Sequence, residues 1–182
     1  MLTGARLMEL VRAERRDEAI ILLLPAFRRK VFGLAYSILR DRESAEDVTQ
    51  EVFIKVWRAL PGYDGRASIS TWIYTITRNA SVSALRARHP QSSLSDPDVM
   101  EAAEANYPGP ATDVLAERAA ILKIVDRLPT KQRQVVMLFY MDEQSHEEVA
   151  TMLAIPVGTV KTLLHRARAQ LLAGATKSRS TA

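Results

Sequence analysis

Cysteine is absent from the 182 residues of the chain, and glycine is scarce at 7 residues. Without a thiol, the chain has no disulfide framework, no zinc–cysteine site and no cysteine nucleophile. Few glycines and short β-branched runs disfavour an all-β fold. The longest strongly apolar run, Ala19 to Pro25, is too short to cross a bilayer. Acidic residues such as Glu9 and Glu14 do not fit a signal peptide, so we expect a globular, cytoplasmic protein without membrane insertion.

Charge is unevenly distributed along the chain, although the net charge is only +4. No acidic residue occurs between Gly65 and Ser95, or between Gly158 and Ala182. The stretch from His89 to Val114 instead lacks Lys and Arg and holds half of the 8 prolines. Proline removes a backbone donor and restricts the residue before it, so this stretch is predicted to be a flexible acidic linker. The predicted organisation is a domain at 1–88, a linker at 89–113, a domain at 114–173 and a disordered tail at 174–182.

Apolar residues recur with a helical period in both domains, and no period-two pattern predicts a strand. We therefore expect an all-α chain of two small helical domains. One predicted helix carries Val48, Val52 and Val56 on its inner face and ends at Pro61-Gly62. The other predicted helices, apart from the pair at 145–171, span residues 5–20, 22–39, 70–88, 115–128 and 130–141.

Two helices near the C-terminus fit a helix-turn-helix. Ser145 and Glu148 have capping-box spacing, and residues 154–158 make a short turn. The second helix places Val160, Leu164, Ala167 and Leu171 on one side and Thr162, His165 and Arg166 on the other. A basic outer face of this kind suits the major groove of DNA. An antiparallel helix pair with a solvated basic face is the alternative.

Aromatic residues alternate with Arg, Thr and Asn across residues 62–79, and no acid follows Asp64 there. Stacking on aromatic side chains contributes roughly 1–3 kcal/mol per base, so this composition suits unstacked single-stranded bases. Trp72 and Tyr74 can equally be core residues, and the loop at 62–70 is the better candidate for a base pocket.

Two sets of motifs together resemble the sigma-70 family. Residues 45–57 (AEDVTQEVFIKVW), 65–68, 70–74 and 77–79 are similar to its region 2. Residues 128–129, 132–133, 147–150, 158–161 and 165–168 are similar to its region 4. The resemblance covers most of residues 16–172, and a chain with only these two domains resembles the extracytoplasmic-function (ECF) group.

The resemblance implies a sigma factor that directs bacterial core RNA polymerase to promoters and helps to melt the −10 element. The implied partners are core polymerase (the β′ clamp helices and the β subunit), promoter DNA and an anti-sigma factor, and the implied setting is a stress or environmental response. No catalytic residue, cofactor or metal ion is implied. The acidic linker would enter the polymerase near the RNA exit path, although a simple tether remains the alternative.

The resemblance also assigns residues to three contacts. Those for core polymerase are Glu46, Asp47, Gln50, Glu51, Phe53 and Lys55. Those for the single-stranded −10 element are Tyr63, Asp64, Arg66, Ser68, Thr71, Trp72, Tyr74, Thr75, Arg78 and Asn79. Those for the −35 duplex are Thr159, Lys161, Thr162, His165, Arg166 and Arg168. For the acidic helix, a solvated face is the alternative.

The chain departs from the family pattern at two positions. Leu163 stands where an Arg is usual in the recognition helix, and Ser83 stands where an Asp is usual. By helical spacing Leu163 borders the core, so one DNA contact is expected to be missing. These changes bear on the promoter sequence rather than on the function.

Two other classes of function remain. An ordinary helix-turn-helix regulator accounts for residues 145–172 but leaves residues 46–57 and the aromatic loop unexplained. A helical nuclease would need a metal-ligand set, but His89, His146 and His165 are scattered and the acids follow an amphipathic pattern.

Overall fold

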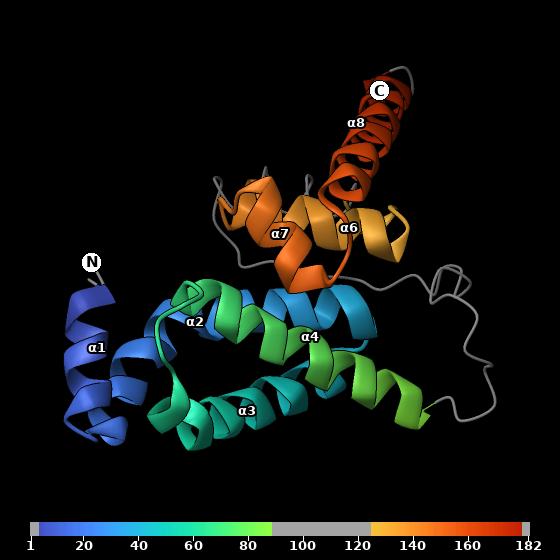
Figure 1. The fold of residues 1–182 in the computed structure, drawn as a ribbon. Coiled ribbons are helices and arrows are strands. Elements are labelled where there is room, and N and C mark those ends of the chain that lie inside the picture. The colour runs from blue at the N-terminus through green and yellow to red at the C-terminus, as the bar shows by residue number, and fades with distance from the viewer. Residues whose placement is uncertain (1–3, 89–124, 180–182) are drawn as a thin grey trace. The chain divides into compact units, whose positions relative to one another are not determined.

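The protein is described by a computed structural model that covers residues 4–88 and 125–179, with side chains as far as residue 173. Every regular element in these ranges is helical, which confirms the all-α prediction (Figure 1). The chain forms two compact units: helices α1 to α4 belong to the first, and α6 and α8 belong to the second. No helix within the described ranges is long and apolar enough to span a membrane.

The first unit is a bundle of three long helices with one short helix packed against it. Helices α2, α3 and α4 contact one another pairwise, and α1 packs on α2. Leu23, Val52 and Ile73, one from each long helix, are fully buried because the apolar positions of the helices face a common centre. The elements are α1 (Gly4–Arg12), α2 (Arg16–Leu39), α3 (Arg42–Ala59), a 3-10 turn (Leu60–Gly62) and α4 (Ile69–Arg88).

The predicted division between the first two helices is wrong. The structure breaks the chain after Arg12, not near residue 21, and α2 continues through Pro25. The corner forms because Glu14 adopts a left-handed conformation at φ 56° and the amide of Arg15 donates to the carbonyl of Leu10. Glycine usually holds that position, so the sequence carried no signal for it.

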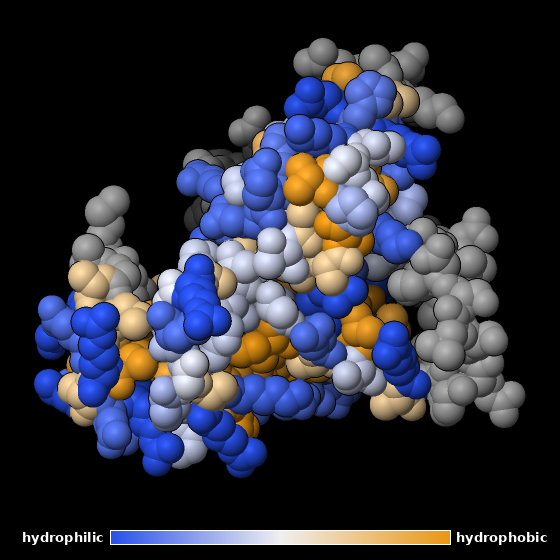
Figure 2. Space-filling view, in the orientation of Figure 1, coloured by the Kyte–Doolittle hydropathy of each residue, from blue (hydrophilic) through white to orange (hydrophobic). Residues whose placement is uncertain are grey.

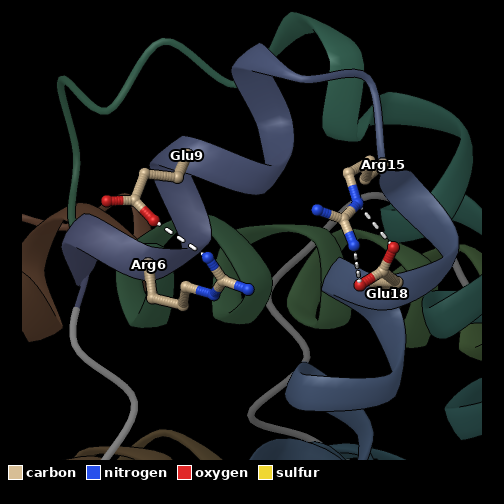
Figure 3. A network of polar contacts seen from close by, with 4 residues as sticks. All are labelled: Arg6, Glu9, Arg15 and Glu18. Carbon is tan, nitrogen blue, oxygen red and sulfur yellow. Dashed lines mark hydrogen bonds and ion pairs between the residues drawn. The ribbon is translucent and has the colours of Figure 1, made fainter.

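Two exposed ion pairs lie on either side of this corner, as Figure 3 shows. Arg6 contacts Glu9 within α1 at 3.1 Å, and Arg15 contacts Glu18 at the start of α2 at 2.5 Å. Exposed pairs of this kind contribute about 1 kcal/mol at most. The corner therefore depends chiefly on buried apolar residues of α1 such as Leu7 and Leu10.

Helix α3 begins at a strong cap. The Asp41 carboxylate accepts a hydrogen bond from the amide of Ser44 at 2.9 Å, and the Arg88 guanidinium at the end of α4 lies 3.3 Å away. The hydrogen bonds from Ser44, and then the charge of Arg88, lower the pKa of Asp41 below its usual value of 3.8. One side chain thus fixes the first turn of α3 and connects it to the last residue of α4.

The C-terminal part of the described chain contains α6 (Thr130–Val136), a π-helical segment (Met137–Met141), α7 (His146–Leu153) and α8 (Val157–Arg179). The predicted helix at 130–141 is confirmed, with its last five residues in the wider π form. The predicted helix at 115–128 lies mostly outside the described residues. At its end, Val125 and Leu128 are buried, and Pro129 precedes α6.

Replacing the cap tests how α3 begins. Asp41→Ala should lower the free energy of unfolding by about 1 kcal/mol at neutral pH. Because the folded-state pKa of Asp41 lies below the unfolded value, its stabilisation is present above pH 3.8 and is lost as the pH falls through the folded pKa. Urea unfolding at several pH values should therefore show the two proteins converging in acid. A difference that stays constant with pH would contradict this role.

Candidate functional site

The outer face of α3 is acidic and exposed, as the sequence predicted. Glu46, Asp47, Gln50 and Glu51 are all exposed, because the buried positions of α3 hold the opposite face against α2 and α4. Glu46 pairs with Arg42 at 2.8 Å and Glu51 with Lys55 at 2.6 Å. Asp47 and Gln50 have no partner in the part of the chain that the structure describes. The carboxylate of Asp47 and the amide of Gln50 are therefore available to pair with groups of another molecule.

Two residues assigned to this face lie elsewhere. Phe53 is only 7% exposed and packs in the core, so the structure corrects its prediction as a contact residue. Lys55 lies on the flank of α3 toward α4, where it lines an open groove with Arg58, Asn79 and Ser83. The lining of this groove also includes the apolar residues Ala59, Ile76 and Ala80. A residue predicted for polymerase thus lies beside one predicted for DNA.

Figure 2 shows hydrophilic side chains over most of the visible face, with apolar surface open between them. The groove beside Lys55 combines basic Lys55 and Arg58 with apolar Ile76, a combination that suits a nucleotide, since its phosphate is anionic and its base has apolar faces.

The loop before α4 is held in a defined shape. The Tyr63 hydroxyl donates to the carbonyl of Ala67 at 2.8 Å, and its ring lies 5.1 Å from that of Trp72. Partial burial, and then the charge of Asp64, raise the pKa of Tyr63. Gly65 has φ +76°, which favours glycine. The loop is therefore already shaped before any ligand binds.

Asp64 organises the exposed tip of this loop. Its carboxylate accepts from the amide of Arg66 at 3.0 Å and pairs with the Arg66 guanidinium at 3.1 Å. The Arg66 side chain is nevertheless 90% exposed. It can reach a phosphate without disturbing the loop.

Helix α4 separates the −10 candidates into outer and inner residues. Thr71 and Tyr74 are 6% and 0% exposed, so the structure corrects their prediction as base contacts: both belong to the core. Ser68 accepts from the amide of Thr71 at 3.1 Å and caps the helix. Asn79 is exposed; the partly buried residues are Trp72, Thr75 and Arg78.

The helix-turn-helix begins with the predicted capping box. The amide of Ser145 donates to the Glu148 carboxylate at 2.9 Å, and the amide of Glu148 donates to the Ser145 hydroxyl at 3.2 Å. Leu171, one of the predicted inner residues of the two helices, is partly exposed. The other predicted inner residues are buried: Val149, Ala150, Leu153, Val160, Leu164 and Ala167. Leu163 is partly buried, in agreement with its predicted place at the edge of the core.

The predicted duplex contacts lie together on the outer face of α8. All six are exposed: Thr159, Lys161, Thr162, His165, Arg166 and Arg168. The Thr162 hydroxyl donates to the carbonyl of Gly158 at 2.9 Å, and its oxygen can still accept a bond. Arg168 donates to the hydroxyl of Tyr140 at 2.5 Å, so it is held in place by the π-helical segment.

Two clusters were missed by the sequence reasoning. Tyr140 lies 28 residues from Arg168, and the indole NH of Trp57 donates to Asp17, 40 residues away, at 2.7 Å. The Arg16 guanidinium also lies 4.3 Å from the centre of the Trp57 ring. None of these three contacts follows from helical periodicity, because each joins side chains of different helical segments. Among the described residues, no three His, Asp or Glu side chains gather as a metal site.

Comparison with known proteins relates both units to one family. Residues 23–90 match the family model for Sigma-70 region 2, and residues 118–171 match the model for Sigma-70, region 4. The chain is 32% identical over 165 residues to the ECF RNA polymerase sigma factor SigW of Bacillus subtilis, covering 85% of this chain and 88% of SigW. It is 33% identical over 179 residues to the RNA polymerase sigma-H factor of Pseudomonas aeruginosa, covering 92% and 93%.

A solved structure agrees with these relatives. The sigma factor RpoE of Bartonella quintana, crystallised with the anti-sigma factor NepR, is 26% identical and has a TM-score of 0.62. The similarity covers 85% of this chain and 92% of that one.

Removal of the capping box tests the geometry of the helix-turn-helix. Ser145→Ala should lower the free energy of unfolding by about 1 kcal/mol and accelerate hydrogen exchange at the Glu148 amide, because that amide loses its acceptor. Ser83→Ala, an exposed serine within α4, is the matched control and should change neither quantity. Unchanged exchange at Glu148 would contradict the observed cap.

Proposed function

Because the chain belongs to the sigma-70 family, in its extracytoplasmic-function group, we propose that α3 docks it on core polymerase while its two units bind two separate promoter elements. The chain is a factor for promoter-specific initiation of transcription. One observation carries the assignment of surfaces: the two family matches fall on separate helical units, and each unit has its own exposed charged face. Because its proposed partner is core polymerase, we propose that the chain acts in the cytoplasm.

The acidic face of α3 is the proposed docking site for the β′ clamp helices. Asp47 and Gln50 carry the proposal, because both are exposed and neither has a partner in the described ranges. Glu46 and Glu51 add negative charge on either side. A surface of this sign attracts a basic partner and fixes its register.

Loss of these two side chains should weaken docking. Asp47→Ala combined with Gln50→Ala should raise the Kd for core polymerase by about tenfold or more, because both groups pair only in the complex. Fluorescence anisotropy with labelled chain measures the change. Glu9→Ala, an exposed carboxylate on α1, is the control and should bind as the unmodified chain does. Equal affinity for the double variant and the control would refute the docking face.

The loop at 62–68 and the outward side of α4 form the proposed −10 site. Arg66 and Asn79 are exposed, and Trp72 presents part of its ring beside Tyr63. We assign Lys55 and Arg58 to this site as well, because they share the groove with Asn79. Single-stranded bases would stack on the aromatic rings while the basic groups hold phosphates.

The outer face of α8 is the proposed reader of the −35 duplex. Lys161, His165 and Arg166 can donate to phosphates and base edges, while Thr162 can donate or accept. Arg168 is held by Tyr140, so we assign it a fixed phosphate contact. The capping box contributes by fixing the first helix of the motif, against which α8 is oriented.

A single phosphate contact can be measured by its salt dependence. Arg166→Ala should weaken binding to promoter duplex and reduce the slope of log K against log salt by roughly 0.9, because one fewer counterion is released. Arg12→Ala removes the same charge from exposed α1 and should leave the slope unchanged. An unaltered slope for Arg166→Ala would remove this residue from the contact list.

An anti-sigma factor is the proposed regulator. The similar sigma factor RpoE of Bartonella quintana was crystallised with one, NepR. A protein that covers the acidic face of α3 or the basic face of α8 would block polymerase or DNA. The signal that releases such a regulator would then decide when this chain acts.

A further inference from the structure

Helix α1 packs beside the loop at 62–68, here called the −10 loop. It contacts both α2 and the 3-10 turn Leu60–Gly62, which leads into that loop. Figure 1 shows α1 at the end of the bundle where α3 passes into the loop. The match to Sigma-70 region 2 covers residues 23–90, so α1 lies outside it. The motifs that indicate function therefore leave α1 without an assigned role.

The side of α1 that faces the bundle is firmly anchored. Leu7 and Leu10 are 1% and 2% exposed, and Val11 is also buried. The left-handed residue Glu14 and the hydrogen bond from the Arg15 amide to the Leu10 carbonyl fix the corner between α1 and α2. A helix held in this way can support a neighbouring loop, because it does not move independently of the bundle.

The −10 loop places no side chain of its own in the core. Between Leu60 and Thr71, which are 1% and 6% exposed, no residue is buried. The hydrogen bonds from the Tyr63 hydroxyl and to the Asp64 carboxylate join residues of the loop to one another. Such local bonds set the shape of the loop, but its position on the bundle depends on contacts with residues outside it.

Met8 on α1 makes such a contact. A Cβ added at Gly65 would lie 3.4 Å from the Met8 Sδ and 3.5 Å from its Cε, so the end of the Met8 side chain lies against the backbone of Gly65. These are ordinary van der Waals distances. Met8 is half-buried, and its flexible thioether can fit an irregular backbone such as this left-handed turn. The contact supports the residue next to Arg66.

We propose that α1 positions the −10 loop, with Met8 as the positioning residue that acts through Gly65. Contacts from two helices then hold the loop, since the Tyr63 ring also meets Trp72 of α4. A loop that is held before binding loses less conformational entropy when bases bind. The proposal rests on the proposed function, and it extends the −10 site to a helix that makes no DNA contact of its own.

Hydrogen exchange of the free chain tests whether Met8 holds the loop. Met8→Ala should accelerate exchange of the Tyr63 and Arg66 amides roughly three- to tenfold, because both donate to acceptors in or beside the loop. Met8→Leu, which keeps an apolar side chain of similar volume, should restore the unmodified rates. Glu9→Ala, an exposed neighbour on α1, is the matched control, and the Glu148 amide of the second unit should be unaffected throughout. Circular dichroism shows whether each variant is folded, and Met8→Gln serves if Met8→Ala unfolds.

Promoter opening tests whether this support matters for the −10 site. The probe is a genomic promoter fragment that supports chain-dependent initiation with core polymerase, labelled with 2-aminopurine in the non-template strand of its −10 element. Met8→Ala should lower the equilibrium constant for opening roughly three- to tenfold, and Met8→Leu should restore it. The Kd of both variants for core polymerase should change less than about twofold, because the proposed docking face lies on α3. A general loss of stability would not separate opening from docking in this way.

Arg66→Ala, measured in parallel, separates the possible failures. If Arg66→Ala reduces opening while Met8→Ala behaves as Glu9→Ala does in both measurements, α1 does not position the loop and the −10 site stands. Faster exchange with unchanged opening would also overturn the proposal, because the contact would then serve the fold alone. If Arg66→Ala opens the promoter normally, the −10 assignment itself is wrong and the proposal fails with it.

Discussion

The packing of α3 between α2 and α4 is the constraint on which the first unit depends. Val48, Val52 and Val56 are at most 3% exposed, and together they fix the rotation of α3 about its axis. That rotation turns Asp47 and Gln50 outward and Lys55 toward α4. A helix rotated otherwise would bury carboxylates at a high free-energy cost. The same apolar contacts that stabilise the fold therefore decide which side chains are exposed on the face proposed for polymerase and which on the face proposed for DNA.

In the second unit, buried apolar residues likewise fix which side of α8 faces outward. Val160, Leu164 and Ala167 hold one side of α8 in the core, which leaves Lys161, His165 and Arg166 on the other side. The reciprocal bonds of the capping box fix where α7 begins, and the bond from Tyr140 restrains Arg168. Neither contact reads DNA sequence by itself. Both contacts restrict side-chain and helix conformations in the free chain, so the proposed DNA-binding face of α8 would lose less conformational entropy on binding.

The helical period of apolar residues in the sequence predicted much of this arrangement. It predicted α4 to within one residue, the inner face of α7 and α8, and the exposed carboxylates of α3. It misplaced the corner at Glu14, because a left-handed turn without glycine has no sequence signature. The family resemblance, not periodicity, assigned Phe53 and Tyr74 to contacts, although tertiary packing buries both. Pairs such as Trp57 with Asp17 depend on how helices meet, which a one-dimensional pattern does not contain.

The central proposal is that one chain brings core polymerase to a promoter through two promoter elements. Transcription reconstituted from purified chain, core polymerase and genomic promoter fragments, with start sites mapped, tests this most directly. The account predicts chain-dependent starts whose promoters share two short sequences, one upstream in duplex DNA and one that is melted near the start. No chain-dependent start on any fragment, or starts whose promoters share only one element, would contradict it.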